Sequence, residues 1–518
     1  MKIMRSGITF GIIAGLLTFL FGGWSVAIIG SLMGVGLGMG LGSGLERKDP
    51  LKIAKEVFPT ALVAGAILTI LSLYQNGFIQ DAIGKRPAEI NVVIFGNLIG
   101  FLGSVFFTTL LAGLHGLPEK EEQKWKMFLL AALVIAFPFI DKLTALRWTA
   151  QIIFALIFVI LGLGLNIVVG YAGLLDLGYA AFFAIGAYTT GMLSSPVHGI
   201  HINFWIVIWI AAAMAAVWGF MLGAPTLPLR GDYLAIVTLG FGEIVPVLFR
   251  NLIDITIKEP FTCWILPMFR INTSCITLVD HFDLTLGEKG ISPIGRPSLP
   301  LIGQFESSNP ITWYFLIIAI ILLSVFVIRR LRDSRLGRSW MAIREDELAA
   351  AQMGIDPVKT KLAAFALGAT FSGFAGAFYG AYISGIFPSV FEFSTSIIIL
   401  CVVILGGIGN INGVIVGGLV LMTADRLFLP ALKDFLASLL THTVLPAIND
   451  PVIQLAVKDN TNPILYRFLL FGLTLVIMMA VRPEGMIPNA QVRAELHPDE
   501  LPAIEAETPT TNNQAKKG

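Results

Sequence analysis

Charged side chains are scarce in this sequence. Asp, Glu, Lys and Arg make up only 13% of the 518 residues, whereas 56% are hydrophobic, and the mean hydropathy is +0.81. A soluble globular protein could not bury so much apolar surface, so that class is excluded. The formal net charge of +1 gives no indication of a nucleic-acid partner. The composition therefore predicts an all-α fold, a polytopic transmembrane helical bundle in contact with membrane lipid.

The residue groups that form most catalytic and metal sites are also missing. The six histidines lack the spacing of metal ligands, and no Ser/His/Asp grouping is present. No G-x-x-x-x-G-K-[ST] motif occurs, so the chain has no P-loop of its own. We therefore expect no catalytic residue, no metal site, no bound cofactor and no enzymatic activity.

The three cysteines are too few for a disulfide framework. Cys401 lies in an apolar run and is interpreted as a small core residue. Cys263 and Cys275 share one polar loop, and they could pair only in an oxidising compartment. A bond between them and two free thiols both remain open.

Long apolar runs are abundant. About 14 are long enough, or nearly so, to cross a membrane; they are 7–23, 25–44, 57–75, 91–114, 127–141, 149–170, 177–193, 203–223, 232–250, 311–328, 361–382, 395–408, 411–428 and 464–481. The first two could form one kinked element, and 395–408 is short enough to be re-entrant.

The runs fall into two blocks. Residues 1–145 form an N-terminal transmembrane block, and residues 146–482 form a longer block that contains the Gly-dense motifs. The start resembles a signal peptide, but no A-x-A-like site follows, so we interpret it as retained membrane structure. Residues 483–518 form a tail rich in Pro, Glu, Thr and Asn, for which we expect disorder past residue 492.

A charged island at 329–360 separates two of the apolar runs. Lys and Arg concentrate in cytoplasmic loops, so the arginines of this island place it in the cytoplasm. Counting spans from there puts both the N- and the C-terminus inside. The loops assigned inside then hold more Lys and Arg than those outside, as the rule requires.

The same island has features of a docking element. Residues 345–353 are rich in Ala and good helix formers, and Gly354 is suited to a C-terminal cap. Asp356 is suited to N-cap the next helix, with Pro357 at its first position. A solvated linker would explain the arginines alone, but an Ala-rich helix between two anchored spans favours a surface for another protein.

Small residues recur at helical spacing in two ladders, Gly30 to Gly42 and Gly368 to Gly380. Close packing on small residues is a main source of helix association in lipid, so tight packing within one subunit explains both ladders. A moving surface is the alternative. The run 406–413 lacks dinucleotide spacing, and a tight turn or broken helix fits it better.

Carboxylates within the apolar runs are few, and Asp176, Asp232 and Glu243 are the ones we single out. A buried carboxylate is costly in a membrane, so we expect each to face the bundle interior or a wet cavity. For Asp232, a pair with Arg230 at a helix end is the favoured interpretation. For Glu243, a pathway lining and a hydrogen bond to neighbouring backbone are equally open.

Several of these stretches resemble one family. Glu347-Leu348-Ala349-Ala350 followed by Gly354 resembles the EAA-type loop of ABC importer permeases, which docks on ATPase subunits. Residues 162–175, 229–244 and 361–379, with 406–410, resemble the LivM-type permease subunit of branched-chain amino acid ABC transporters. The resemblance covers about 150–485.

The resemblance implies a subunit of an ATP-driven importer for branched-chain or other neutral amino acids, multi-pass in the bacterial inner (plasma) membrane. The implied partners are a second permease of the LivH type, two cytoplasmic ATPase subunits that bind the ATP, and an extracytoplasmic amino-acid-binding protein. Residues 146–482 would be the permease core.

Within that core, residues 344–354 would be the coupling helix, with five assigned positions, Arg344, Glu347, Ala349, Ala350 and Gly354. The resemblance supplies no substrate contacts, so Asn166, Asp176 and Glu243 are our own predictions for the translocation pathway.

The sequence leaves alternatives open. Residues 1–145 are long for the core family, and 255–290 and 431–463 look extended, so the substrate is not fixed. A urea or short-amide permease shares much of the architecture. An ion-coupled secondary transporter would use Asp176 and Glu243 as coupling sites. Carboxylates and irregular glycine segments at membrane depth argue against a non-transporting scaffold.

Overall fold

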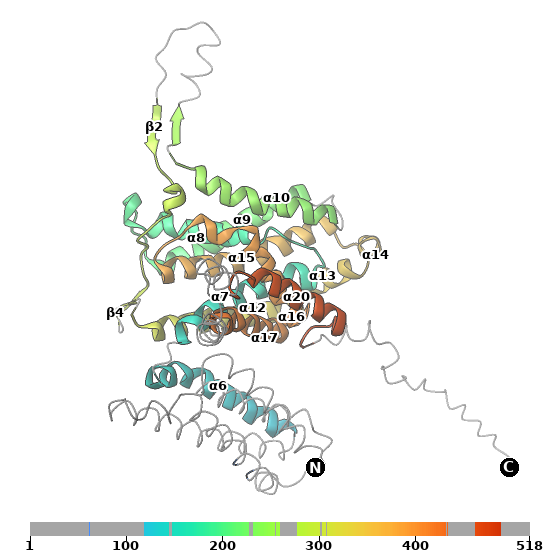
Figure 1. The fold of residues 1–518 in the computed structure, drawn as a ribbon. Coiled ribbons are helices and arrows are strands. Elements are labelled where there is room, and N and C mark those ends of the chain that lie inside the picture. Colours follow the sequence, from blue (N-terminus) through green and yellow to red (C-terminus); the bar gives the residue numbers. More distant parts are fainter. Residues whose placement is uncertain are drawn as a thin grey trace, which may run out of the picture.

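The fold is given by a computed structural model, which describes residues 58, 62, 119–144, 148–226, 232–253, 255–258, 277–300, 303–306, 308–430, 433 and 462–487. Within these residues helices predominate, and two short antiparallel sheets complete the fold (Figure 1). Most of the N-terminal block 1–145, both Cys263 and Cys275, and most of the tail 483–518 lie outside the described residues.

The membrane class is confirmed. In the described part of the chain, 5 helical segments are long and apolar enough to cross a membrane: Trp148–Tyr171, Phe204–Pro225, Tyr233–Asn251, Pro310–Asp333 and Pro357–Ile383. Shorter apolar helices cover Ala180–Ser194, Phe393–Gly406 and Arg467–Ala480. The total of about 14 spans stays a prediction.

The main helices differ in the length of the segments that connect them. They are α7 (Trp148–Leu165), the π-helical η1 (Asn166–Tyr171), α8 (Ala180–Ser194), α9 (Phe204–Thr226), α10 (Asp232–Asn251), α12 (Pro310–Asp333), α15 (Pro357–Ile383), α16 (Phe393–Gly406), α17 (Ile411–Thr423), the π-helical η6 (Ala424–Phe428) and α20 (Arg467–Val481).

Helix α15 lies at the centre and packs most extensively against α9, α8 and α7. Its glycines allow this closeness: a Cβ at Gly376 would lie 2.5 Å from the carbonyl oxygen of Phe183, and one at Gly186 of α8 would lie 2.6 Å from the Cα of Gly373. Tight packing within one subunit thus accounts for the glycine ladder of α15.

The chain between α7 and α8 is a broken span. The linker of residues 172–179 is not helical, although residue 179 lies deep in the bundle. The Tyr179 hydroxyl donates to the carbonyl of Gly368 at 2.7 Å. With a rise of about 1.5 Å per residue, Gly368 lies roughly 16 Å along α15 from its start. Of the predicted run 177–193, Ala180–Ser194 is helical, and the irregular backbone before it is buried by protein.

The two ends of the bundle differ in character. At one, which we call the basic end, Arg329 donates to Asn412 at 3.4 Å, and the amide of Ile487 donates to Gly406 at 3.1 Å. From the other, the hairpin of β1 (Ile255–Lys258) and β2 (Thr277–Phe282) projects (Figure 1). The small sheet of β3 (Ser298–Leu299) and β4 (Gly303–Gln304) lies on that side too.

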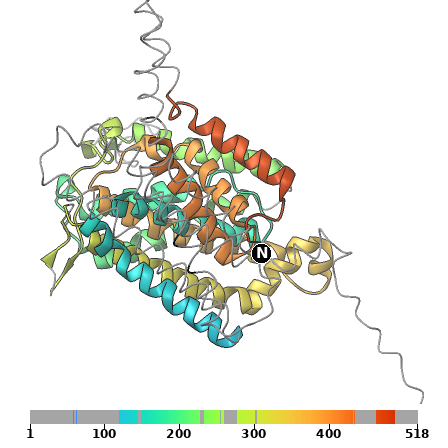
Figure 2. The ribbon, with the colours of Figure 1, turned by 60° about the horizontal axis from the view of Figure 1, so that its bottom comes forward.

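Helix α6 (Glu119–Thr144) runs along the edge of the bundle beside α12 (Figure 2). The hydroxyl of Tyr314 on α12 donates to the carbonyl of Val134 at 3.0 Å. Near the end of α6, the Asp141 carboxylate accepts the amides of Trp148 and Thr149, both at 2.9 Å. These amides are free donors in the first turn of α7, so Asp141 caps it and joins the end of block 1–145 to the core.

Candidate functional site

The charged island folds into two short helices instead of the single predicted one. α13 spans Arg335–Glu345 and α14 spans Glu347–Gln352. Asp346 stands between them with extended backbone, and its carboxylate accepts the amides of Leu348 at 2.8 Å and Ala349 at 3.0 Å. The predicted helix 345–353 is therefore wrong at its start, since Asp346 stops α13 and caps α14.

α14 presents apolar side chains outward at the basic end. Leu348 is 64% exposed and Met353, directly after the helix, is 83% exposed, whereas Ala350 is 5% exposed and packs inward. α14 stands at the periphery of the bundle (Figure 1). Exposed apolar side chains on a water-facing turn are typical of a protein contact.

An ion pair fixes α14 to the central helix. The Lys361 ammonium lies 2.7 Å from a Glu347 carboxylate oxygen, and the two side chains are 6% and 25% exposed. A buried ammonium needs such a partner, because its charge is costly to remove from water. Glu347, one of the predicted coupling residues, thus serves as an anchor on the inner side of α14.

The turn after α14 has the two caps that the sequence predicts. Gly354 has φ +88°, a left-handed conformation suited to glycine. Asp356 accepts the amide of Val358 at 3.0 Å and that of Lys359 at 3.2 Å, with Pro357 at the first position of α15. Hydrogen bonds from the backbone and side chain of Lys359 lower the pKa of Asp356. Both caps are confirmed.

Trp340 holds α13 against α15. Its side chain is fully buried, and its indole N–H donates to the carbonyl of Thr360 at 2.8 Å. The indole N–H, the only polar group of this side chain, is thus hydrogen-bonded while the ring is buried. With the ion pair at Lys361, the corner that α13 and α14 form is fastened to the first turns of α15 at two points. We call it the docking corner, after the role that the sequence predicts for it.

Arg344 does not lie on α14. It lies in the last turn of α13 and is exposed as a whole, but its guanidinium donates to the carbonyl oxygen of Gly170 in η1 at 2.5 Å. The segment 344–354 is therefore not one helix, and Arg344 lies on α13, apart from Glu347, Ala349 and Ala350 on α14. Its role in coupling stays a prediction.

Asn166 and Asp176, both predicted for the pathway, are in the interior. Asn166 is fully buried, and its Oδ1 accepts the amide of Gly409 at 2.8 Å. Asp176 is 2% exposed, and its Oδ1 accepts the amide of Gly178 at 2.9 Å. In the described part of the chain, Asn166 Nδ2 and Asp176 Oδ2 have no hydrogen-bond partner. Such groups can bind a polar ligand or water.

Glu243 is placed differently from Asp176. It lies on the exposed face of α10, beside a shallow recess of about 400 Å³ that Ile244, Val247, Leu248 and Asn251 also line. Of the two expected placements, the interior of this chain is wrong for Glu243, because α10 turns it outward, and its part in a pathway stays a prediction. Arg230 lies outside the described residues, so its pairing with Asp232 stays a prediction.

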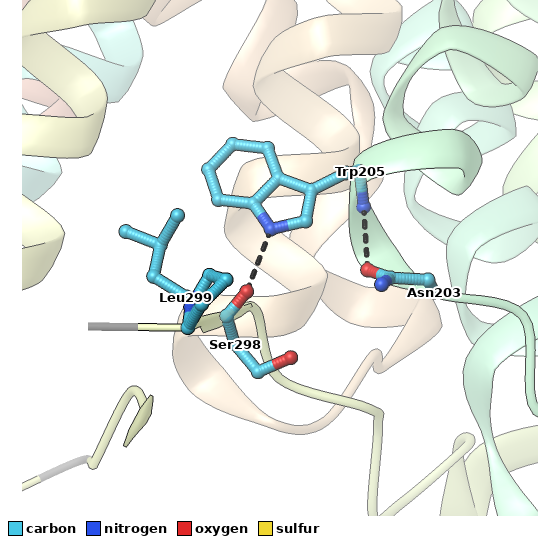
Figure 3. Close-up of a pocket in the computed structure, with 5 residues that line it drawn as sticks. Asn203, Trp205, Ser298 and Leu299 are labelled. Atoms are coloured by element: carbon cyan, nitrogen blue, oxygen red, sulfur yellow. Dashed lines mark hydrogen bonds between the residues drawn. The ribbon is translucent and has the colours of Figure 1, made fainter. Parts of the chain in front are cut away.

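A larger pocket of about 570 Å³ opens at the end of the bundle away from the basic end, between the start of α9 and β3 (Figure 3). The Trp205 indole donates to the carbonyl of Ser298 at 2.9 Å, and the Trp205 amide donates to Asn203 at 3.2 Å. The first bond ties β3 to α9, and the second lies at the start of α9 itself. None of the predicted site residues lines this pocket.

The sequence did not single out Lys361, Trp340 or Gly170 as parts of the docking corner. Lys361 offered a signal, since it is a lone cation at the start of an apolar run and would need a nearby carboxylate. Gly170 offered none, because its role depends on a contact across 174 positions of sequence.

Comparison with known proteins matches residues 149–478 to the family described as branched-chain amino acid transport system / permease component. The chain is 36% identical over 396 residues to the high-affinity branched-chain amino acid transport system permease protein LivM of Escherichia coli strain K12, covering 72% of this chain and 77% of that protein. A probable LivM of Methanocaldococcus jannaschii is 23% identical over 65% of this chain and 92% of its own.

The LivH permease of E. coli strain K12 is also similar, at 29% identity over 163 residues, 29% of this chain and 50% of that protein. No solved structure matches. The family match extends from the start of α7 into α20 and includes the docking corner and the linker. The chain therefore belongs to the family of branched-chain amino acid transport permease components, and it is a LivM-type permease.

Proposed function

We propose that this chain is the membrane-spanning permease subunit of an ATP-driven ABC importer for branched-chain amino acids, and that α14 is the helix on which separate ATPase subunits act. The names of the relatives support the substrate class. The observation that carries the docking role is the pair of exposed side chains, Leu348 and Met353, on a corner anchored by Glu347 and Lys361.

In this proposal the basic end faces the cytoplasm, as the arginines of α12 and α13 favour. Both termini then lie inside. ATP is bound by two cytoplasmic partner subunits, and this chain binds none. A second permease related to LivH completes the membrane part, and an extracytoplasmic protein delivers the amino acid to the opposite end.

We place the translocation pathway along the side of the bundle that the linker of residues 172–179 forms. Asp176 has a buried oxygen without a described partner, which is suited to accept a hydrogen bond from an α-ammonium group. Glu243 would face the second permease, because a carboxylate on an otherwise apolar helix face is costly in lipid. Asn166 supports the linker from the basic end.

The docking role is tested by replacing Leu348 and Met353 with Asp in the full set of co-expressed subunits. We expect the ATPase subunits to be lost from the purified complex and ATP-dependent leucine uptake to fall to background. The matched control places two aspartates at exposed apolar positions of the opposite end, Val197 and Ile200. It should keep the ATPases bound.

The driving force is tested in the same system. Uptake should stop when ATP is depleted and persist with an uncoupler. Uptake that follows an ion gradient and ignores ATP would overturn the proposal, as would retention of the ATPases by the Leu348 and Met353 variant.

A further inference from the structure

We propose that Arg344 is the positioning residue that transmits movement of the docking corner to the linker of residues 172–179, and so couples ATP hydrolysis to opening of the bundle. This inference rests on the proposed function. It assigns the transmission step to one side chain and its two contacts.

The two contacts of Arg344 bracket a single turn of backbone. Its guanidinium donates to the Gly170 carbonyl at 2.5 Å. Its Cγ would lie 2.8 Å from a Cβ at Gly173, whose φ is +70°. The glycine at 173 thus lets the arginine stem lie directly against the chain. A shift of α13 would push or pull this turn as a unit.

The turn belongs to backbone that is not an ordinary α-helix. Residues 166–171 are π-helical, and the linker that follows has no helical structure. Insertions of this kind occur at functional positions and deform more readily than a regular helix. One turn earlier, Asn166 accepts the Gly409 amide at 2.8 Å, and this bond holds the start of the π-helical segment in place.

The far part of the linker contacts helices deep in the bundle. The amide of Leu177 donates to the Thr238 hydroxyl of α10 at 3.1 Å. The amide of Ala180 donates to the Ser396 hydroxyl of α16 at 2.9 Å. Tyr179 contacts α15 as described above. Movement of one short segment would therefore reach α10, α15 and α16 together.

Arg344 is not required to hold α13 in place. Trp340 already joins α13 to α15, and the Glu347–Lys361 pair joins α14 to α15. The Arg344 contact is directed to a different element and is made by a charged donor, which forms a strong hydrogen bond. Trp340 and the Glu347–Lys361 pair thus hold the corner on α15, and Arg344 connects the corner to the backbone that leads into the linker.

The test uses the complete transporter with its binding protein in proteoliposomes and measures ATP hydrolysis and leucine uptake together. We expect Arg344→Ala to keep the ATPases bound and to hydrolyse ATP at a rate within about twofold of wild type, while leucine taken up per ATP falls by about fivefold or more. Arg344→Lys should recover part of the uptake, since it restores a cationic donor.

Arg338→Ala is the matched control. Arg338 lies on the same helix and also donates to a backbone carbonyl, that of Asp333 at 2.8 Å, but this contact is local. It should leave uptake per ATP unchanged. Gly173→Ala is a second variant, which moves the arginine stem while leaving its charge; it should lower uptake per ATP as Arg344→Ala does.

Wild-type uptake per ATP in both Arg344→Ala and Gly173→Ala would overturn the inference. Equal losses in Arg338→Ala and Arg344→Ala would overturn it as well, because any arginine of α13 would then serve. Absence of ATP-dependent uptake in the wild-type complex would instead refute the proposed function, so the two failures are distinguishable.

Discussion

The ammonium of Lys361 lies 2.7 Å from the carboxylate of Glu347, and this ion pair joins α14 to the central helix α15. Lys361 is 5% exposed and lies within the first turns of a helix that spans the bundle. The pair therefore connects the exposed surface of Leu348 and Met353 to the part of the molecule that packs against α7, α8 and α9.

Glu347→Ala should destabilise the docking corner, because it leaves a buried ammonium without this carboxylate. The expected cost is about 2 kcal/mol, below that of a fully buried pair since Glu347 is partly exposed. We expect a lower Tm of the purified chain and weaker retention of the ATPases. Replacing both residues with Met should recover part of the loss.

Lys359→Ala is the control for that pair. Lys359 has a side chain that is 86% exposed and pairs with Asp356 within the same turn. Loss of an exposed pair should be barely measurable. A Tm as low as that of Glu347→Ala would contradict the structural role given to Lys361.

Gly354→Ala should strain the turn between α14 and α15. The φ of +88° costs a residue with a Cβ about 1 to 2 kcal/mol. Among the described residues, apart from its chain neighbours, no atom lies within 4 Å of the position that a Cβ would take, so the cost comes from the backbone conformation. Gly354→Asn should be milder, since Asn tolerates this conformation. Thermal unfolding of the two variants measures the difference; equal Tm values would refute the explanation.

Gly186→Ala should weaken the contact between α8 and α15, where a Cβ would lie 2.6 Å from the Cα of Gly373. Overpacking of this kind costs about 1 to 3 kcal/mol. Gly240→Ala on α10 is the control, because within the part of the chain that the structure describes its Cβ would meet no atom within 4 Å. There the substitution should be neutral or stabilising by up to about 1 kcal/mol. Tm values of the isolated chain in detergent compare them, and a stable Gly186→Ala would contradict the packing account.

Asp176→Asn should separate function from stability. Asn keeps an oxygen for the Gly178 amide but removes a charge that is costly in the bundle, so the Tm should stay the same or rise. If Asp176 lines the pathway, uptake should fall about tenfold, which corresponds to a rise of ~1.4 kcal/mol in the activation free energy of transport. Asp333→Asn, at the exposed end of α12, should leave uptake unchanged. Full uptake by Asp176→Asn would remove this residue from the pathway.

Local signals predicted the docking corner well. The Gly354 turn and the Asp356–Pro357 start of α15 depend on residues that are neighbours in sequence, so their types were sufficient. The break at Asp346 was missed because an acidic residue also fits the first turn of a longer helix. Its capping role depends on backbone geometry that composition does not fix.

Contacts between distant segments could not be predicted in the same way. The reach of Arg344 to Gly170 and the outward placement of Glu243 follow from how whole helices are rotated against one another. The apolar runs 149–170 and 177–193 left most of the linker between two predicted spans, but apolar length could not predict that it lies buried among other helices. Its position in the bundle depends on a contact between distant segments, the hydrogen bond from Tyr179 to Gly368 on α15.

The placement of α14 is tested most directly by labelling a single cysteine at Met353, which is 83% exposed, after Cys263, Cys275 and Cys401 have been replaced with Ser. A membrane-impermeant maleimide should modify this cysteine in inside-out vesicles but not in intact cells, and bound ATPase subunits should protect it. Modification from outside intact cells, or equal modification with and without the ATPases, would contradict a cytoplasmic docking helix that receives work from a separate ATPase.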